Sequence, residues 1–84
     1  MINLNYPEMS PLNCNITRDG ITVEITIYRD GTPDWSLEVT DETGASTVWD
    51  DRFETDQAAL DEIQRVIEKD GIASIVKLQK YFVD

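Results

Sequence analysis

The stretch from Ile21 to Val39, "ITVEITIYRDGTPDWSLEV", alternates apolar and polar residues on both sides of a turn. Successive side chains of a β-strand point to opposite faces of a sheet, so this period of two predicts two antiparallel strands with one apolar and one polar face. An apolar sheet face has to be buried against a second layer. The alternation therefore constrains the chain to a layered fold.

A further hairpin is predicted at Asp19-Gly20, because glycine accepts the positive φ that a two-residue turn demands. The register that joins apolar residues to apolar residues pairs Arg18 with Ile21, Ile16 with Val23, Cys14 with Ile25 and Leu12 with Ile27. Residues 1–11 contain Pro7 and Pro11 and are expected to form an extended lead-in.

Two more strands are predicted, one from Trp35 to Thr40 with Trp35 pointing inward, and one in "STVWDD" at residues 46–51. Pairing Ile25 with Leu37 would set Glu24 directly opposite Glu38 on the polar face. In the last strand Val48 and Trp49 cannot both point inward without a bulge, so its phase stays open.

Residues 55–70 are predicted to form an amphipathic helix, with Thr55 as its N-cap and Gly71 as its left-handed C-terminal cap. Its apolar stripe follows a spacing of three and four and consists of Ala59, Leu60, Ile63, Val66 and Ile67. Asp61 and Arg65 are expected to pair on the solvent side.

These elements predict a single α+β domain over residues 1–84. A four-stranded antiparallel meander at 12–50 carries the 55–70 helix on its apolar face. Residues 72–84 fit either a short second helix or a strand, and we favour the helix.

The chain is strongly acidic, with a net charge of −10, and the excess is densest between Asp41 and Glu62, where eight acids face one arginine. Such a surface should repel nucleic acid and lipid headgroups and attract basic proteins. We therefore expect no direct nucleic-acid binding and no membrane association.

The compartment is expected to be the cytoplasm, most simply of a bacterium or in a phage-encoded protein. Cys14 is the only cysteine, so no internal disulfide can form. The N-terminal residues show no basic start followed by a long apolar run, and no stretch reaches the length of a membrane helix.

Residues with catalytic chemistry are scarce. Histidine is absent and the four glycines are isolated, so neither the commonest acid–base group nor a phosphate-binding loop is present. Cys14 is predicted to be an inert thiol on the apolar face. We predict no catalytic, cofactor-binding or metal-ligating residues and expect a protein that is not an enzyme.

The polar face is the candidate site. The predicted register would line up Asn15, Glu24, Glu38 and, if it points outward, Trp49, so that an aromatic ring beside acids could hold a lysine or arginine. The candidate docking residues for a basic partner protein are Asn15, Glu24, Glu38, Trp49, Asp50 and Asp51. The plainer interpretation is a solvated sheet face.

Two alternative functions remain. The Asp41–Glu62 carboxylates could imitate DNA phosphates in an inhibitor of a nucleic-acid-binding protein, or the domain could bind a small ligand or a metal ion. A monomer is favoured, because the prolines at one sheet edge and Asp50 and Asp51 at the other oppose edge pairing. A dimer through a sheet edge is the other option.

Overall fold

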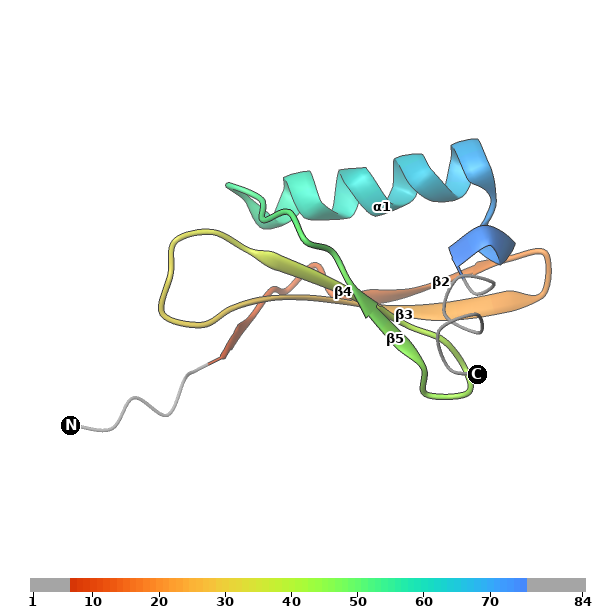
Figure 1. The fold of residues 1–84 in the computed structure, drawn as a ribbon, viewed down its shortest axis with the longest axis horizontal. Coiled ribbons are helices and arrows are strands. Elements are labelled where there is room, and N and C mark those ends of the chain that lie inside the picture. The colour runs from red at the N-terminus through yellow and green to blue at the C-terminus, as the bar shows by residue number, and fades with distance from the viewer. Residues whose placement is uncertain (1–6, 76–84) are drawn as a thin grey trace.

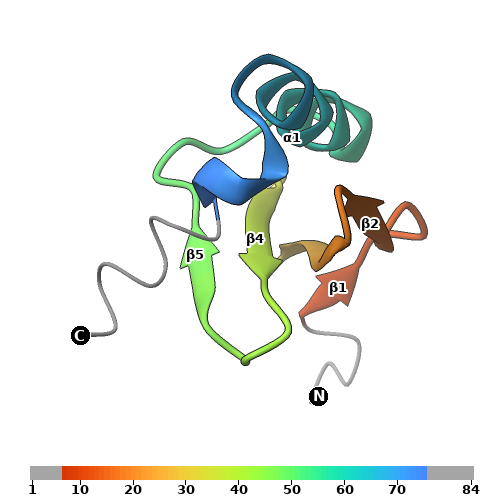
Figure 2. The same cartoon turned by 90° about the vertical axis from the view of Figure 1, so that its right-hand side faces the viewer.

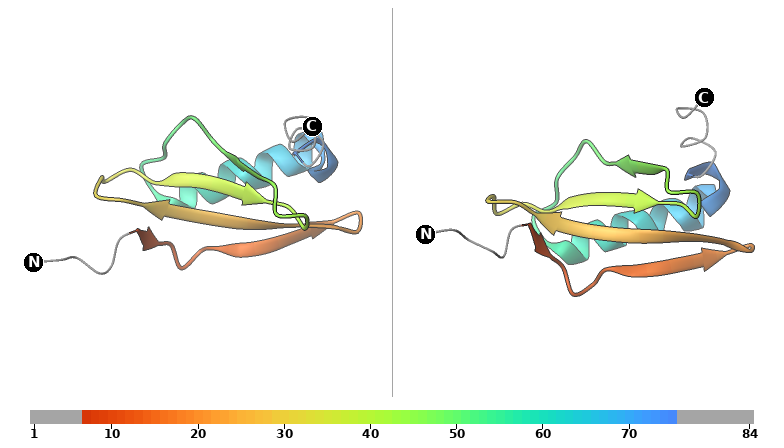
Figure 3. Two further views of the ribbon diagram at one scale, coloured as in Figure 1. Left: turned by 60° about the horizontal axis from the view of Figure 1, so that its bottom comes forward. Right: turned by 90° about the horizontal axis from the view of Figure 1, so that it is seen from below.

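The computed structural model describes residues 7–75 and confirms the α+β class. An antiparallel sheet carries one long helix, α1 (Asp56–Asp70), on one face (Figures 1 and 2). The strands are β1 (Glu8–Met9), β2 (Cys14–Arg18), β3 (Ile21–Arg29), β4 (Ser36–Thr40) and β5 (Ser46–Val48). β3 is central: β4 and then β5 follow on one side of it, while β1 and β2 share its other edge (Figure 3).

The hairpin between β2 and β3 forms at Asp19-Gly20 as predicted, with φ values of 55° and 78° at its two turn residues. The register from Arg18–Ile21 to Cys14–Ile25 is also as predicted. Apolar pairing across the two strands and a turn that tolerates positive φ act together here.

The first strand differs from the prediction, because it is split in two. The expected lead-in contains β1, whose Glu8 and Met9 pair with Arg29 and Tyr28 of β3. Between the two halves, the Asn13 side-chain oxygen accepts the Ile27 N–H at 2.7 Å, so Leu12 does not pair with Ile27. Pro11 lacks an N–H, and a strand is therefore readily interrupted at this point.

Ser10 ties this interruption to the helix. Its N–H donates to the Ile27 carbonyl at 2.9 Å, and its hydroxyl donates to the Asp56 carboxylate at 2.8 Å. Ser10 is buried, and the hydroxyl also accepts the Leu12 N–H. The chain is thus drawn from the sheet edge toward the first turn of α1.

The predicted register between β3 and β4 is wrong by two residues. Ile25 pairs with Val39, so Glu24 lies opposite Thr40 and Glu38 lies opposite Thr26. Residues 30–35 connect the two strands, and Trp35 forms a bridge with Phe53 through N–H···O bonds of 2.7 and 2.9 Å.

Trp35 also makes a cation–π contact with Arg29. The Arg29 guanidinium carbon lies 4.3 Å from the centre of its ring, while Arg29 Nε donates to Glu8 at 2.8 Å. This contact ties β1, the end of β3 and the start of β4 together. Trp35 is inward and buried, as predicted.

The core lies between the sheet and α1, and Val23, Ile25 and Leu37 are fully buried in it with Ile63, as predicted. The buried apolar residues are Ile16, Val23, Ile25, Ile27, Trp35, Leu37, Val39, Ala59, Ile63, Ile67, Ile72 and Ile75. Leu60 and Val66 pack against this cluster at its margin.

The helix ends are largely as predicted. Thr55 accepts the Ala58 N–H at 3.0 Å, and the Gly71 N–H donates to the Ile67 carbonyl at 2.9 Å. With φ 85° and ψ 148°, Gly71 is not in the left-handed helical region but in a region that is nearly restricted to glycine. On the surface, Arg65 pairs with Glu62 at 2.8 Å instead of with Asp61.

The short second helix is present as far as the structure describes it. Residues 72–75 are helical, and Ile72 and Ile75 are buried beneath the end of α1. The remainder of the predicted 72–84 segment lies outside the described residues.

Replacing Ile63 with alanine should reveal how far the fold depends on this core. Ile63 is completely buried, and we expect Ile63→Ala to lower the free energy of unfolding by about 2–5 kcal/mol in urea denaturation. The exposed neighbour gives the control, because Gln64→Ala should change it by less than about 0.5 kcal/mol. Equal losses in the two variants would contradict the packing.

Candidate functional site

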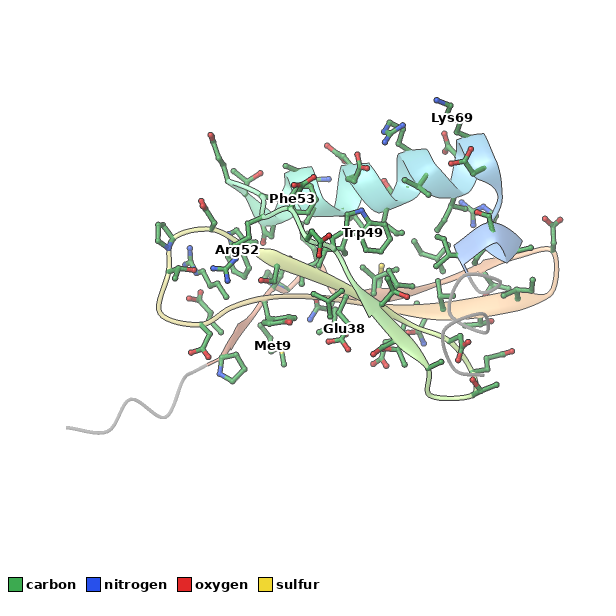
Figure 4. All side chains as sticks on the ribbon, in the orientation of Figure 1. Met9, Glu38, Trp49, Arg52, Phe53 and Lys69 are labelled. Atoms are coloured by element: carbon green, nitrogen blue, oxygen red, sulfur yellow. The ribbon has the colours of Figure 1, made fainter. Side chains whose placement is uncertain are left out.

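The outer face of the sheet is the side turned away from α1, and no described element covers it (Figure 3). All five strands contribute outward side chains, which follow from the registers and the alternation of each strand. They are Met9, Asn15, Thr17, Thr22, Glu24, Thr26, Tyr28, Ser36, Glu38, Thr40, Ser46 and Val48. Glu38 and Met9 are seen on this side in Figure 4.

The two predicted glutamates share this face but are not directly opposed. Asn15 pairs with Glu24, as predicted, whereas Glu38 is displaced by two residues from the partner of Glu24. Diagonal neighbours of this kind lie about 7–8 Å apart, which reduces the repulsion between the two carboxylates.

Trp49 does not belong to the outer face. Val48 pairs with Glu38 and points outward, while Trp49 donates its N–H to the Leu37 carbonyl and packs against the core. Figure 4 shows Trp49 and Phe53 between the sheet and α1. In β5, Val48 therefore points outward and Trp49 points inward. Trp49 is not beside Glu38 on the outer face, so it cannot bind a cation there as predicted.

Asp50 and Asp51 are exposed in the segment that follows β5. The β4–β5 pairs end at Glu38 and Val48, so neither aspartate is paired with an outward residue of β4. The structure therefore brings together Asn15, Glu24 and Glu38 of the candidate docking residues. Two apolar side chains that the sequence did not single out join them, because Met9 is 56% exposed and Val48 is 50% exposed.

Two hollows open beside Glu24. The edge hollow, of about 390 Å³, is lined by Met9, Asn13, Cys14, Asn15, Glu24, Ile25 and Thr26. The second, of about 250 Å³, is lined by Asn15, Thr22, Glu24, Thr40, Asp41 and Glu42. Asn15 and Glu24 line both hollows, so this pair lies between the two.

Charge is distributed unevenly between the faces. The outward strand positions carry Glu24 and Glu38 and, within residues 7–75, no lysine or arginine. Arg29 lies on the Trp35 side of the sheet, and Arg18 pairs with Ile21 on the helix-facing side. Arg52 lies in the segment after β5, and Arg65 and Lys69 belong to α1. The outer face therefore presents an unbalanced negative potential to an approaching partner.

Cys14 is exposed, contrary to the prediction of a buried thiol. It does pair with the buried Ile25, but it begins β2 next to the interruption, where no neighbouring strand covers it. In the sequence, Pro11 was the residue that could have indicated this exposure, because proline interrupts a strand. The same interruption explains why Met9 and Asn13 line the edge hollow.

Asp41 stabilises the turn between β4 and β5 through hydrogen bonds to Thr43 and Ala45. Its Oδ1 accepts from the Thr43 hydroxyl at 2.6 Å, the Thr43 N–H at 2.9 Å and the Ala45 N–H at 3.1 Å, and the residue is 8% exposed. The Thr43 hydroxyl is the main cause that lowers the pKa of Asp41; desolvation opposes it, and backbone N–H groups of the turn add to it.

The acids between Asp41 and Glu62 are spread over the β4–β5 turn, the segment after β5 and α1. Several have local partners: Asp56 accepts from Ser10, Asp61 from Gln57, and Glu62 from Arg65. Imitation of DNA stays a prediction, and these contacts reduce the number of carboxylates that are free to serve it.

Comparison with protein-family models, with curated proteins and with solved structures gives no match. The described part of the chain contains no group of three or more metal-ligating side chains. Residues 7–75 also include no helix that is both long enough and apolar enough to span a membrane.

The Asp41 turn gives a prediction for stability against pH. We expect Asp41→Ala to lower the free energy of unfolding by about 1–2 kcal/mol near neutral pH, because it removes hydrogen bonds to a charged group. Folding lowers this pKa, so the stabilisation is present above the unfolded carboxyl pKa of about 3.9 and is lost as the pH falls through the lowered value.

Urea denaturation of both proteins from pH 7 to pH 2 measures the difference, which should shrink in acid. Asp41→Asn keeps an acceptor oxygen without the charge and should fall between the two. A difference that stays constant down to pH 2 would show that the charge of Asp41 plays no part.

Proposed function

We propose that this protein is a non-enzymatic interaction module that docks a basic segment of another protein on the outer face of its sheet. One observation carries the proposal: outward positions of five strands form an uncovered surface with two carboxylates and no basic residue among the described residues. An opposite charge is the complement that such a surface favours.

The chemistry of the face suits lysine and arginine in particular. These side chains have apolar stems below a charged head, so they can cover Met9 or Val48 while the head reaches Glu24 or Glu38. Exposed ion pairs contribute at most about 1 kcal/mol each. We therefore expect modest affinity that falls as salt rises.

The proposal places the protein in a reducing compartment, such as the cytoplasm of a bacterium. Support comes from Cys14, which is the chain's only cysteine and is exposed. An exposed thiol in an oxidising environment would be open to pairing with other molecules.

Charge reversal on the outer face should abolish most of the binding. The probe is a synthetic peptide of alternating lysine and serine, titrated into the ¹⁵N-labelled protein at low salt. We expect amide shifts at β3 and β4, and Glu24→Lys with Glu38→Lys should raise the Kd by about tenfold or more, because attraction becomes repulsion at two positions.

A matched control changes the net charge equally on the other side of the molecule. Asp61 and Glu68 are exposed on α1, so Asp61→Lys with Glu68→Lys tests the general effect of charge. It should raise the Kd by less than about threefold, since these sites are outside the proposed surface. Equal losses in the two double variants, or shifts confined to α1, would refute docking on the outer face.

A further inference from the structure

The interruption of the first strand creates the edge hollow, and the geometry points to a binding site within it. We propose that the edge hollow receives one lysine or arginine side chain of the basic partner, with Glu24 as the carboxylate that binds its charged head. This inference rests on the proposed function and assigns a specific anchoring position to it.

The hollow exists because the sheet lacks residues at this point. β1 ends at Met9, opposite Tyr28, and β2 begins at Cys14, opposite Ile25. The intervening chain is held toward the helix by the Ser10–Asp56 hydrogen bond and by Asn13 on Ile27. Thr26 is therefore left without a ladder partner on this edge, and the sheet is notched there, so that residues of both faces line the hollow.

The lining matches a long cationic side chain. At about 390 Å³, the hollow is large enough to admit a single lysine or arginine side chain. Met9 supplies an apolar wall for the methylene stem, and Glu24 supplies the negative charge. The Asn15 side chain, opposite Glu24, offers an amide oxygen as a further acceptor.

Other occupants fit this chemistry less well. Glu24 is the hollow's only carboxylate and the lining has no basic side chain, so an anion would be repelled. A divalent metal requires several charged oxygens, and the described residues hold no such group. The second hollow contains Asp41, but its Oδ1 accepts from Thr43 and Ala45 and its Oδ2 is buried, so neither oxygen is exposed to a cation.

Cys14 provides a direct readout, because it lines the hollow and is the only cysteine in the chain. Alkylation by iodoacetamide, a neutral reagent, is timed by mass spectrometry with and without the lysine–serine peptide. Parallel arms use arginine or glutamine in place of lysine. At saturating peptide we expect the lysine or arginine arm to slow labelling by about fivefold or more, and the glutamine arm to leave it unchanged.

Two matched pairs of variants locate the effect. Glu24→Gln should abolish the protection, whereas Glu38→Gln removes a carboxylate from the same face outside the hollow and should keep it. Thr26→Phe should fill the hollow and abolish protection, while Thr17→Phe places the same ring on an outward position that lines neither hollow. For each variant, the labelling rate with peptide is divided by the rate without peptide, so that a change in the intrinsic reactivity of the thiol cancels.

The outcomes separate this inference from the proposed function. If the peptide binds and shifts the amides of β3 and β4 but Cys14 is labelled at an unchanged rate, the hollow is not the anchor and docking on the face still stands. If Glu24→Gln and Glu38→Gln lose protection equally, Glu24 has no special role and the inference is overturned. If no peptide binds, both proposals fail.

Discussion

Val23, Ile25 and Ile27 of β3 are completely buried, and they face α1 residues Ala59 and Ile63, which are buried as well. Burying one such aliphatic side chain contributes about 1.5–3 kcal/mol, which a chain of 84 residues needs against the entropy of ordering its backbone. This contact determines which face of each strand points toward α1. The side chains on the opposite face are not needed for packing against the helix.

A second constraint acts at the sheet edge. The apolar face of the sheet requires α1 above it, and the start of α1 is joined to the edge through Ser10 and Asp56. Pairing along β3 is interrupted between Met9 and Cys14, the part of the chain that contains Pro11, which has no N–H to donate. The edge hollow therefore lies where the chain turns from the sheet edge toward the start of α1.

Alternation in the sequence was sufficient to predict the layers, the core and the Asp19-Gly20 hairpin, but not the register of β4. A slip of one residue would turn Leu37 and Val39 outward, whereas a slip of two leaves both inward, so the apolar pattern cannot tell Glu24–Glu38 pairing from the observed Glu24–Thr40 pairing. The observed register brings Trp35 to Arg29, whose guanidinium carbon lies 4.3 Å from the centre of the Trp35 ring, and the apolar pattern does not encode this contact.

The candidate site was only partly predictable for the same physical reason. Asn15 and Glu24 follow from a two-residue turn close in sequence, so their pairing was accessible, while the place of Trp49 depended on the phase of β5 against β4. Because Trp49 packs against the core, the proposed docking of a basic segment rests on the carboxylates and on the exposed Met9 and Val48 instead of on an aromatic ring. For the proposed docking, the two hollows beside Glu24 give this face its shape, and one of them lies where the sheet is interrupted.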